Sequence, residues 1–150
     1  MGQGNTNAVV AVVGLHLVLA FSLAIGIFAT KAMENEDVDF SLFVFAMVVS
    51  TYSGFSIIIS IFGAALASPR CDSMQAGLFT GTVGAVVGSS LTLFVLMVLL
   101  NLKSNNPDLE GMIKAFFEVI FIPLAVTNGV GGLGGAYFGR HLGNSERQHY

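Results

Sequence analysis

The feature that most constrains this chain is a set of long apolar stretches without a formal charge. Residues 1–30 contain no Asp, Glu, Lys or Arg, and neither do residues 40–67 or 74–102. An α-helix needs about 20 predominantly apolar residues to cross the hydrocarbon core of a bilayer, whereas a β-barrel strand needs about ten residues of alternating character. Continuous runs of this length therefore predict membrane-spanning α-helices.

A fourth apolar run, free of formal charge from Val119 to Phe138, follows these three, and the four runs fill nearly the whole chain of 150 residues. We predict an all-α membrane protein, a single four-helix transmembrane domain over residues 1–150 with short loops. The expected spans are residues 8–30, 40–67, 74–102 and 112–138. Only 10% of the residues are charged, against roughly 25% in soluble domains, so lipid is the expected solvent for most of the surface.

The composition argues against several classes of function. The net charge is −3, so no basic surface indicates nucleic-acid binding. The one cysteine, Cys71, excludes an intrachain disulfide, and neither Cys-x-x-Cys nor His-Glu-x-x-His spacing is present. The short loops leave no room for a soluble catalytic domain. We expect no enzymatic activity, no cofactor and no metal site.

Four spans would place both termini on one side of the membrane. The Lys and Arg residues divide equally, three on each side, so the positive-inside rule does not decide the orientation. Most of the acidic residues lie on the side opposite the termini, around the first and third loops. We therefore expect both termini in the cytoplasm. The opening hexapeptide Met-Gly-Gln-Gly-Asn-Thr also fits the N-myristoylation pattern at Gly2, although chance is the favoured explanation because a four-span protein needs no lipid anchor.

Small residues recur at intervals of three or four, which places them on one face of each predicted helix. The stripe in the second span is Ser56, Ser60, Gly63 and Ala67. The stripe in the third span is Gly77, Gly81, Gly84 and Gly88. The stripe in the fourth span is Gly131, Gly135 and Gly139. Because helices in lipid associate through close backbone approach, such stripes predict tight helix packing.

Two interpretations of these stripes remain open. All of them could close one four-helix bundle within a single subunit. Alternatively one stripe, with the fourth span favoured, could form a homo-oligomer or dock a larger membrane complex.

Three polar side chains are candidates for a site within the membrane. His16 lies in the first span, and an intramembrane ionisable residue is a functional hypothesis by default. Glu118 is the deepest carboxylate, and Asn128 follows the expected kink at Pro123. The structural alternatives are a neutral histidine bonded to a neighbouring helix, a Glu118–Lys114 pair at the interface, and an interhelical amide hydrogen bond.

The function that these features favour is that of a non-enzymatic membrane subunit, structural or accessory, which acts through glycine-mediated packing with itself or with partner membrane proteins. Its expected partners are the lipid bilayer and a homo-oligomer or larger membrane complex. The alternative is a small ion, proton or solute channel or transporter, with His16, Glu118 and Asn128 lining its path.

Overall fold

The fold is helical throughout the described chain. The computed structural model describes residues 3–30, 38–103 and 108–147, with side chains placed over 6–25, 46–102 and 108–142. All of these residues except 71–73 and 108 lie in helices. The all-α prediction is thus confirmed for the described residues. Gly2 with its lipidation motif, the acidic residues at 34–37 and the loop at 104–107 lie outside them.

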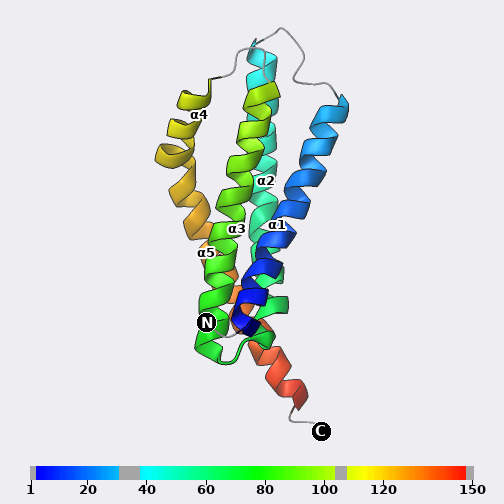
Figure 1. Cartoon of the computed structure of the whole chain (residues 1–150), viewed down its shortest axis with the longest axis vertical. Helices are drawn as coiled ribbons and strands as arrows, with labels where there is room; N and C mark the ends of the chain where they lie inside the picture. The colour runs from blue at the N-terminus through cyan, green and yellow to red at the C-terminus, as the bar shows by residue number, and fades with distance from the viewer. Residues whose placement is uncertain (1–2, 31–37, 104–107, 148–150) are drawn as a thin grey trace.

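Four long helical segments follow one another along the chain (Figure 1). In order, the elements are α1 (Gln3–Thr30), α2 (Val38–Ala67), the 3-10 turn η2 (Ser68–Arg70), α3 (Met74–Lys103), α4 (Leu109–Ala115), the π-helical turn η3 (Phe116–Ile120) and α5 (Phe121–Arg147). The helices begin earlier than the predicted spans at the first, second and fourth segments, because helix formation continues into polar flanking residues.

Three segments are long and apolar enough to cross a membrane, namely Thr6–Ile25, Ala46–Arg70 and Met74–Leu102. Length and composition alone therefore indicate an integral membrane protein. The helix α5 of the fourth segment is also long, but its sequence contains many glycines and Asn128. It is not among the three segments that are apolar enough to cross a membrane.

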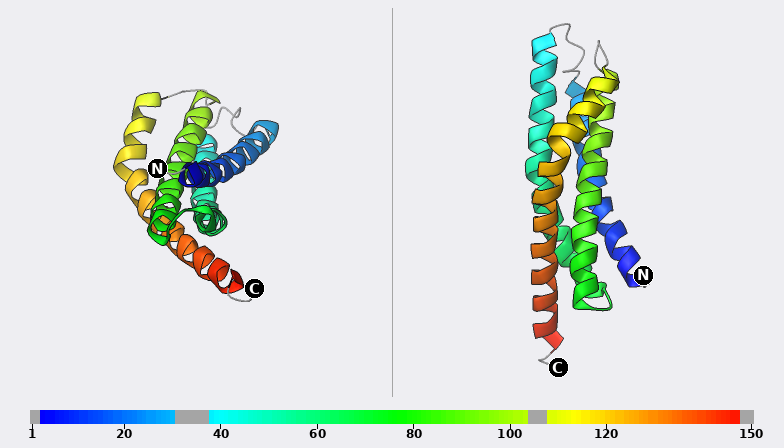
Figure 2. Two further views of the ribbon diagram at one scale, coloured as in Figure 1. Left: turned by 60° about the horizontal axis from the view of Figure 1, so that its bottom comes forward. Right: turned by 90° about the vertical axis from the view of Figure 1, so that its left-hand side faces the viewer.

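Local chemistry explains where the helices begin and bend. The Asp108 carboxylate accepts a hydrogen bond from the Gly111 N–H at 2.9 Å, which caps α4. In η3 the N–H of Phe121 bonds to the carbonyl of Phe116, a wider turn than in an α-helix. Pro123 follows two residues later and cannot donate a backbone hydrogen bond into this turn. The chain changes direction between α4 and α5 (Figure 2).

The helices α2 and α3 form the central pair of the bundle. They pack on each other, and α1 and α5 each pack on both of them. The start of α1, the η2 connection and the end of α5 lie at one end of the molecule, which we call the terminal end (Figure 1). The opposite end, where α3 passes into α4, we call the loop end.

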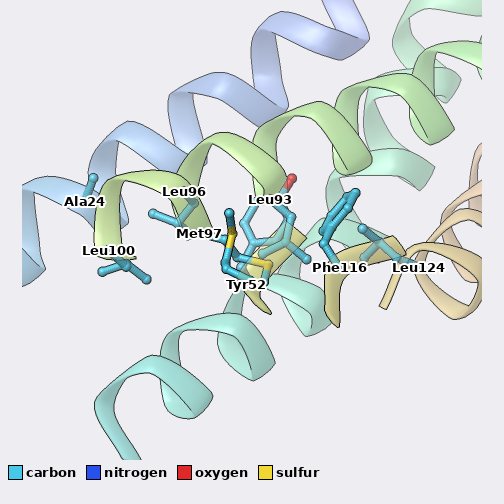
Figure 3. Close-up of a cluster of buried hydrophobic side chains, with 9 residues drawn as sticks. Ala24, Tyr52, Leu93, Leu96, Met97, Leu100, Phe116 and Leu124 are labelled. Carbon is cyan, nitrogen blue, oxygen red and sulfur yellow. The ribbon is translucent and has the colours of Figure 1, made fainter. Parts of the chain in front are cut away.

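The size of the buried side chains changes along the bundle. Towards the loop end the buried core contains Ala24 of α1 and large residues of α2, α3, α4, η3 and α5 (Figure 3). Towards the terminal end the buried apolar cluster consists of Ala8, Val12, Ala67 and Cys71. Large side chains hold helices apart and small ones let them approach, so α1 and α4 diverge from the centre at the loop end (Figure 1).

Candidate functional site

The predicted small residues of α2 and α3 form the surface on which α1 packs. A Cβ atom added to Gly84 would lie 3.2 Å from the Val12 Cβ, and one added to Gly63 would lie 3.3 Å from the Leu15 Cδ1. A Cβ on Gly88 would lie only 2.8 Å from the His16 ring. The glycines therefore let α1 approach closely enough for His16 to reach the middle of the bundle.

The glycines of α5 lie against neighbouring helices of the same chain. At Gly135 a Cβ would collide with the Ile61 carbonyl of α2, and at Gly139 with the Ala65 carbonyl. At Gly131 the nearest atom, on Ile61, would lie at an ordinary 3.4 Å. The stripe of Gly131, Gly135 and Gly139, for which an oligomer surface was one of two interpretations, thus faces α2 within one subunit.

The remaining predicted packing residues are also buried. A Cβ on Gly81 would lie 2.8 Å from the Ala136 Cβ and 3.0 Å from the Ala64 Cβ, which places α2, α3 and α5 together at this level. Ser56, Ser60 and Ala67 are buried on the inner face of α2.

Arg140 joins the end of α5 to the connection between α2 and α3. Its Nη1 donates hydrogen bonds to the Ser68 carbonyl at 3.0 Å and to the Cys71 carbonyl at 2.8 Å. The Arg140 Cδ would lie 2.9 Å from a Cβ on Gly77, so this glycine leaves the space that the side chain crosses. The Ser68 carbonyl also accepts from the Cys71 N–H at 3.1 Å, so the partly buried guanidinium adds a second hydrogen bond there and bonds the Cys71 carbonyl beyond η2.

His16 lies at the centre of a buried polar cluster, which we call the His16 cluster: His16, Tyr52, Ser60, Ser89 and Asn128. The imidazole is fully buried. Its Nδ1 lies 3.2 Å from the Tyr52 hydroxyl oxygen, and its Nε2 lies 3.1 Å from the Ser60 hydroxyl oxygen. Both hydroxyls come from α2, two turns apart, so one helix holds both nitrogens of the ring.

The cluster extends from Ser60 to α5. The Ser60 hydroxyl donates to the Asn128 Oδ1 at 2.6 Å, and the Asn128 Nδ2 donates to the Leu124 carbonyl at 2.9 Å. Asn128 is fully buried. Two of the three predicted polar-path residues, His16 and Asn128, are therefore connected through one serine.

The cluster also reaches α3 through Tyr52. The Tyr52 hydroxyl lies 3.2 Å from the Ser89 carbonyl, and it is placed to donate to it. The Tyr52 ring lies in the buried apolar core (Figure 3). Its hydroxyl oxygen lies 3.2 Å from the His16 Nδ1. Side chains or carbonyls of α1, α2, α3 and α5 thus meet in one hydrogen-bonded group.

Glu118, the third predicted residue, lies apart from this cluster. It is exposed on η3, whereas His16 and Asn128 are fully buried. The neighbouring Phe116 points inward and contacts Phe94 of α3, with ring centroids 5.2 Å apart. The π turn therefore presents an aromatic ring, rather than the carboxylate, to the core.

Sequence reasoning missed Tyr52, Ser89 and the capping role of Arg140. A signal for Tyr52 was present, because Tyr52, Ser56 and Ser60 recur every four residues and so share one face of the helix. No such signal marks Ser89, since its contribution is a backbone carbonyl. The partners of Arg140 lie about 70 positions earlier in the chain, at Ser68 and Cys71.

The chemistry of the cluster is that of neutral hydrogen-bonding groups and one imidazole. Among the described residues, no group of three or more His, Cys, Asp and Glu side chains is placed to hold a metal ion. Three further hydroxyls, those of Thr80, Ser90 and Thr92, are buried on α3 without a hydrogen-bond partner. The arrangement can fix helices to one another and can hold or exchange a proton at the imidazole.

Comparison with known proteins gives no relative. No protein-family model matches the sequence, no curated protein matches it, and no solved structure matches the fold.

Proposed function

We propose that this chain is a small multi-pass membrane protein whose four long helical segments each cross the bilayer. In this proposal α4, η3 and α5 together form the fourth span, and both termini lie in the cytoplasm. Support for a fourth span comes from the packing of α5 along both α2 and α3, which are themselves long and apolar enough to cross.

We further propose that it acts as a non-enzymatic structural or accessory subunit. The observation that carries this proposal is that the polar side chains are used within the bundle: the His16 cluster joins the helices, and Arg140 ties α5 to the α2–α3 connection. The outer faces instead carry large apolar side chains on every long helix, among them Phe21, Phe62, Phe79 and Phe138. Such faces suit contact with lipid or with another membrane protein.

A partner or a second copy would meet the outside of the bundle, because Gly135 and Gly139 are already occupied by α2. Three other glycines, Gly14, Gly54 and Gly134, have no atom within 4 Å of an added Cβ. They are places where a second helix can approach from outside without changing the fold. A leucine at Gly54 or Gly134 would block that approach, and its Cβ would contact no other atom of the bundle.

The mass of the protein after extraction in a mild detergent tests this function. We expect a species several times the mass of one chain, or a stable complex with another membrane protein, measured by light scattering during size-exclusion chromatography. Gly54→Leu or Gly134→Leu should reduce that mass while the helical circular dichroism is retained. A folded wild-type protein that runs as a single chain without a partner would contradict the proposal.

A small channel or transporter is the second candidate function. The specific observation that favours it is the meeting of polar groups from four helices midway along the bundle. Ion or proton flux into liposomes that contain the purified protein tests it. Flux that is lost in His16→Ala would support transport, and retention of flux in Glu118→Gln would agree with the exposed position of that side chain. Liposomes without flux would exclude this candidate.

A further inference from the structure

The donors and acceptors of the His16 cluster can be assigned in sequence, starting from Asn128. Its Nδ2 faces the Leu124 carbonyl at 2.9 Å, and a carbonyl oxygen can only accept, so the amide orientation is fixed. The Oδ1 of Asn128 therefore faces Ser60, at 2.6 Å from its hydroxyl oxygen. The single hydrogen of Ser60 must lie on this bond.

The state of the His16 Nε2 follows from that of Ser60. Because the Ser60 hydrogen points to Asn128, the hydroxyl oxygen can only accept from the ring. The Nε2 atom, 3.1 Å away, must therefore carry a hydrogen. A neutral His16 is consequently the Nε2–H tautomer, with a free lone pair on Nδ1.

The Tyr52 hydroxyl faces two acceptors at equal distance. Its oxygen lies 3.2 Å from the His16 Nδ1 and 3.2 Å from the Ser89 carbonyl. With a neutral ring the hydroxyl donates to Nδ1. With a protonated ring Nδ1 donates to the hydroxyl oxygen, and the hydroxyl hydrogen turns to the Ser89 carbonyl. The same heavy-atom positions therefore give each ring nitrogen a hydrogen bond in both states.

We propose that His16 is a proton-binding site inside the bundle, in which Nδ1 takes up one proton and the Tyr52 hydroxyl turns from Nδ1 to the Ser89 carbonyl. The proton comes from water, and no bond other than hydrogen bonds is broken. A buried charge is costly unless it is paired and hydrogen-bonded, and the His16 cluster supplies the hydrogen bonds. Here each ring N–H donates a hydrogen bond to a hydroxyl oxygen. The Tyr52 hydroxyl in turn donates to the Ser89 carbonyl, and the Ser60 hydroxyl donates to the Asn128 Oδ1.

The groups that face the ring or are linked to it come from three elements. Helix α2 supplies Tyr52 and Ser60, and α3 supplies Gly88. The Ser89 carbonyl of α3 is linked to the ring through Tyr52, and Asn128 of α5 through Ser60. Within the part of the chain that the structure describes, Tyr52 is the titratable side chain that contacts the ring. This inference does not rest on either proposed function, since a packed subunit and a transporter can both hold such a ring.

The nitrogen chemical shifts of the imidazole test the proposal directly. The protein would be labelled with ¹⁵N-histidine in a His141→Gln/His149→Gln background and placed in lipid nanodiscs, so that His16 alone is observed. At alkaline pH we expect the Nε2–H tautomer. On acidification both ring nitrogens should move to the imidazolium position, reversibly and with the helical circular dichroism unchanged.

Two variants test the assignment of the hydrogens. Ser60→Ala removes the acceptor for Nε2–H and should convert the neutral ring to the Nδ1–H tautomer, which donates to Tyr52. Ser53→Ala is the matched control, because the Ser53 hydroxyl donates to the Val49 carbonyl of its own helix. Tyr52→Phe should keep the Nε2–H tautomer but weaken proton binding about tenfold, since a charge-assisted hydrogen bond is lost.

A wild-type ring in the Nδ1–H form, or one that stays neutral until the protein unfolds, would overturn the proposal. If Ser60→Ala does not fold, the wild-type titration decides alone. These measurements read the ring nitrogens, whereas the membrane-subunit proposal is read from the mass of the extracted species, so the two can fail separately.

Discussion

Adjacent glycines of α5 differ in the space around them. A Cβ on Gly135 would collide with the backbone of α2 at Ile61, whereas one on Gly134 would meet no atom within 4 Å. Backbone cannot move aside as a flexible side chain can. A Cβ at Gly135 could therefore be accommodated only if α2 and α5 moved apart along several turns.

We predict opposite effects of the same substitution at these two positions. Alanine is favoured over glycine in a helix by about 1 kcal/mol, so Gly134→Ala should leave stability unchanged or raise it slightly. Gly135→Ala should lower the free energy of unfolding by about 2 kcal/mol, because overpacking outweighs the helix preference. Unfolding by dodecyl sulfate in mixed micelles measures both, and equal stability of the two variants would contradict the close contact with α2.

Arg140 provides a second contrast, with Arg70 as the matched residue. The Arg140 fork reaches two carbonyls with one nitrogen, while Arg70 is exposed. A lysine keeps the charge, but its nitrogen lies one bond nearer the backbone than the Arg140 Nη1 and falls short of the two carbonyls. We predict that Arg140→Lys destabilises by about 1 kcal/mol, and that Arg70→Lys has no measurable effect.

The buried thiol of Cys71 reports on this contact. It is 5% exposed in the folded chain, and its own carbonyl accepts a hydrogen bond from Arg140 at 2.8 Å. Maleimide should therefore label Cys71 slowly in the wild type and faster in Arg140→Lys. Identical labelling rates would show that the guanidinium does not hold this connection closed.

Among the elements, η3 shows how a local irregularity selects which side chain is buried. Phe116 is 2% exposed and Phe117 is 55% exposed, although they are neighbours in the same turn. Phe116 packs on Phe94 and also contacts Phe121 at a centroid distance of 6.1 Å. It is the main aromatic contact between η3 and α3.

We predict that Phe116→Ala is much more damaging than Phe117→Ala. Truncation of a core phenylalanine in soluble proteins costs about 3–5 kcal/mol, and in lipid the transfer part of that cost shrinks because both environments are apolar. A loss of about 2 kcal/mol is expected for Phe116→Ala and little change for Phe117→Ala, measured by the same unfolding assay. A reversed order would mean that η3 turns its other ring inward.

The helices themselves could be predicted from the sequence, because long apolar runs bounded by polar turns carry that signal locally. Their pairing could not: small residues at Gly81 or Gly135 show that something comes close, but not which helix. The π turn at Phe116 also has no local signature beyond the nearby Pro123. The His16 cluster depends on contacts across 36 to 68 positions in sequence, and only the packed structure brings these residues together.

At the scale of the whole molecule, the start of α1 and the end of α5 lie at the same end as η2 (Figure 1). Under the four-span proposal, tags fused at the N-terminus and at the C-terminus must share one side of the membrane. Protease treatment of sealed vesicles should therefore remove both tags or neither. A tag inserted in the loop after α3 should show the opposite behaviour, and removal of only one terminal tag would contradict four spans.

The two hydroxyls that contact the imidazole have a mechanical consequence. Tyr52 and Ser60 stand eight residues apart on α2, a rise of about 12 Å, and the His16 ring lies between them. If α1 slid along α2 by one helical turn, or rotated by one residue, the ring would lose both partners at once. Intermediate positions retain neither bond, so the first helix has one preferred height and one preferred rotation. The two hydrogen bonds of His16 therefore oppose sliding of α1 along α2. Glycines in the helix contact have no directional side-chain bonds and do not oppose it in this way.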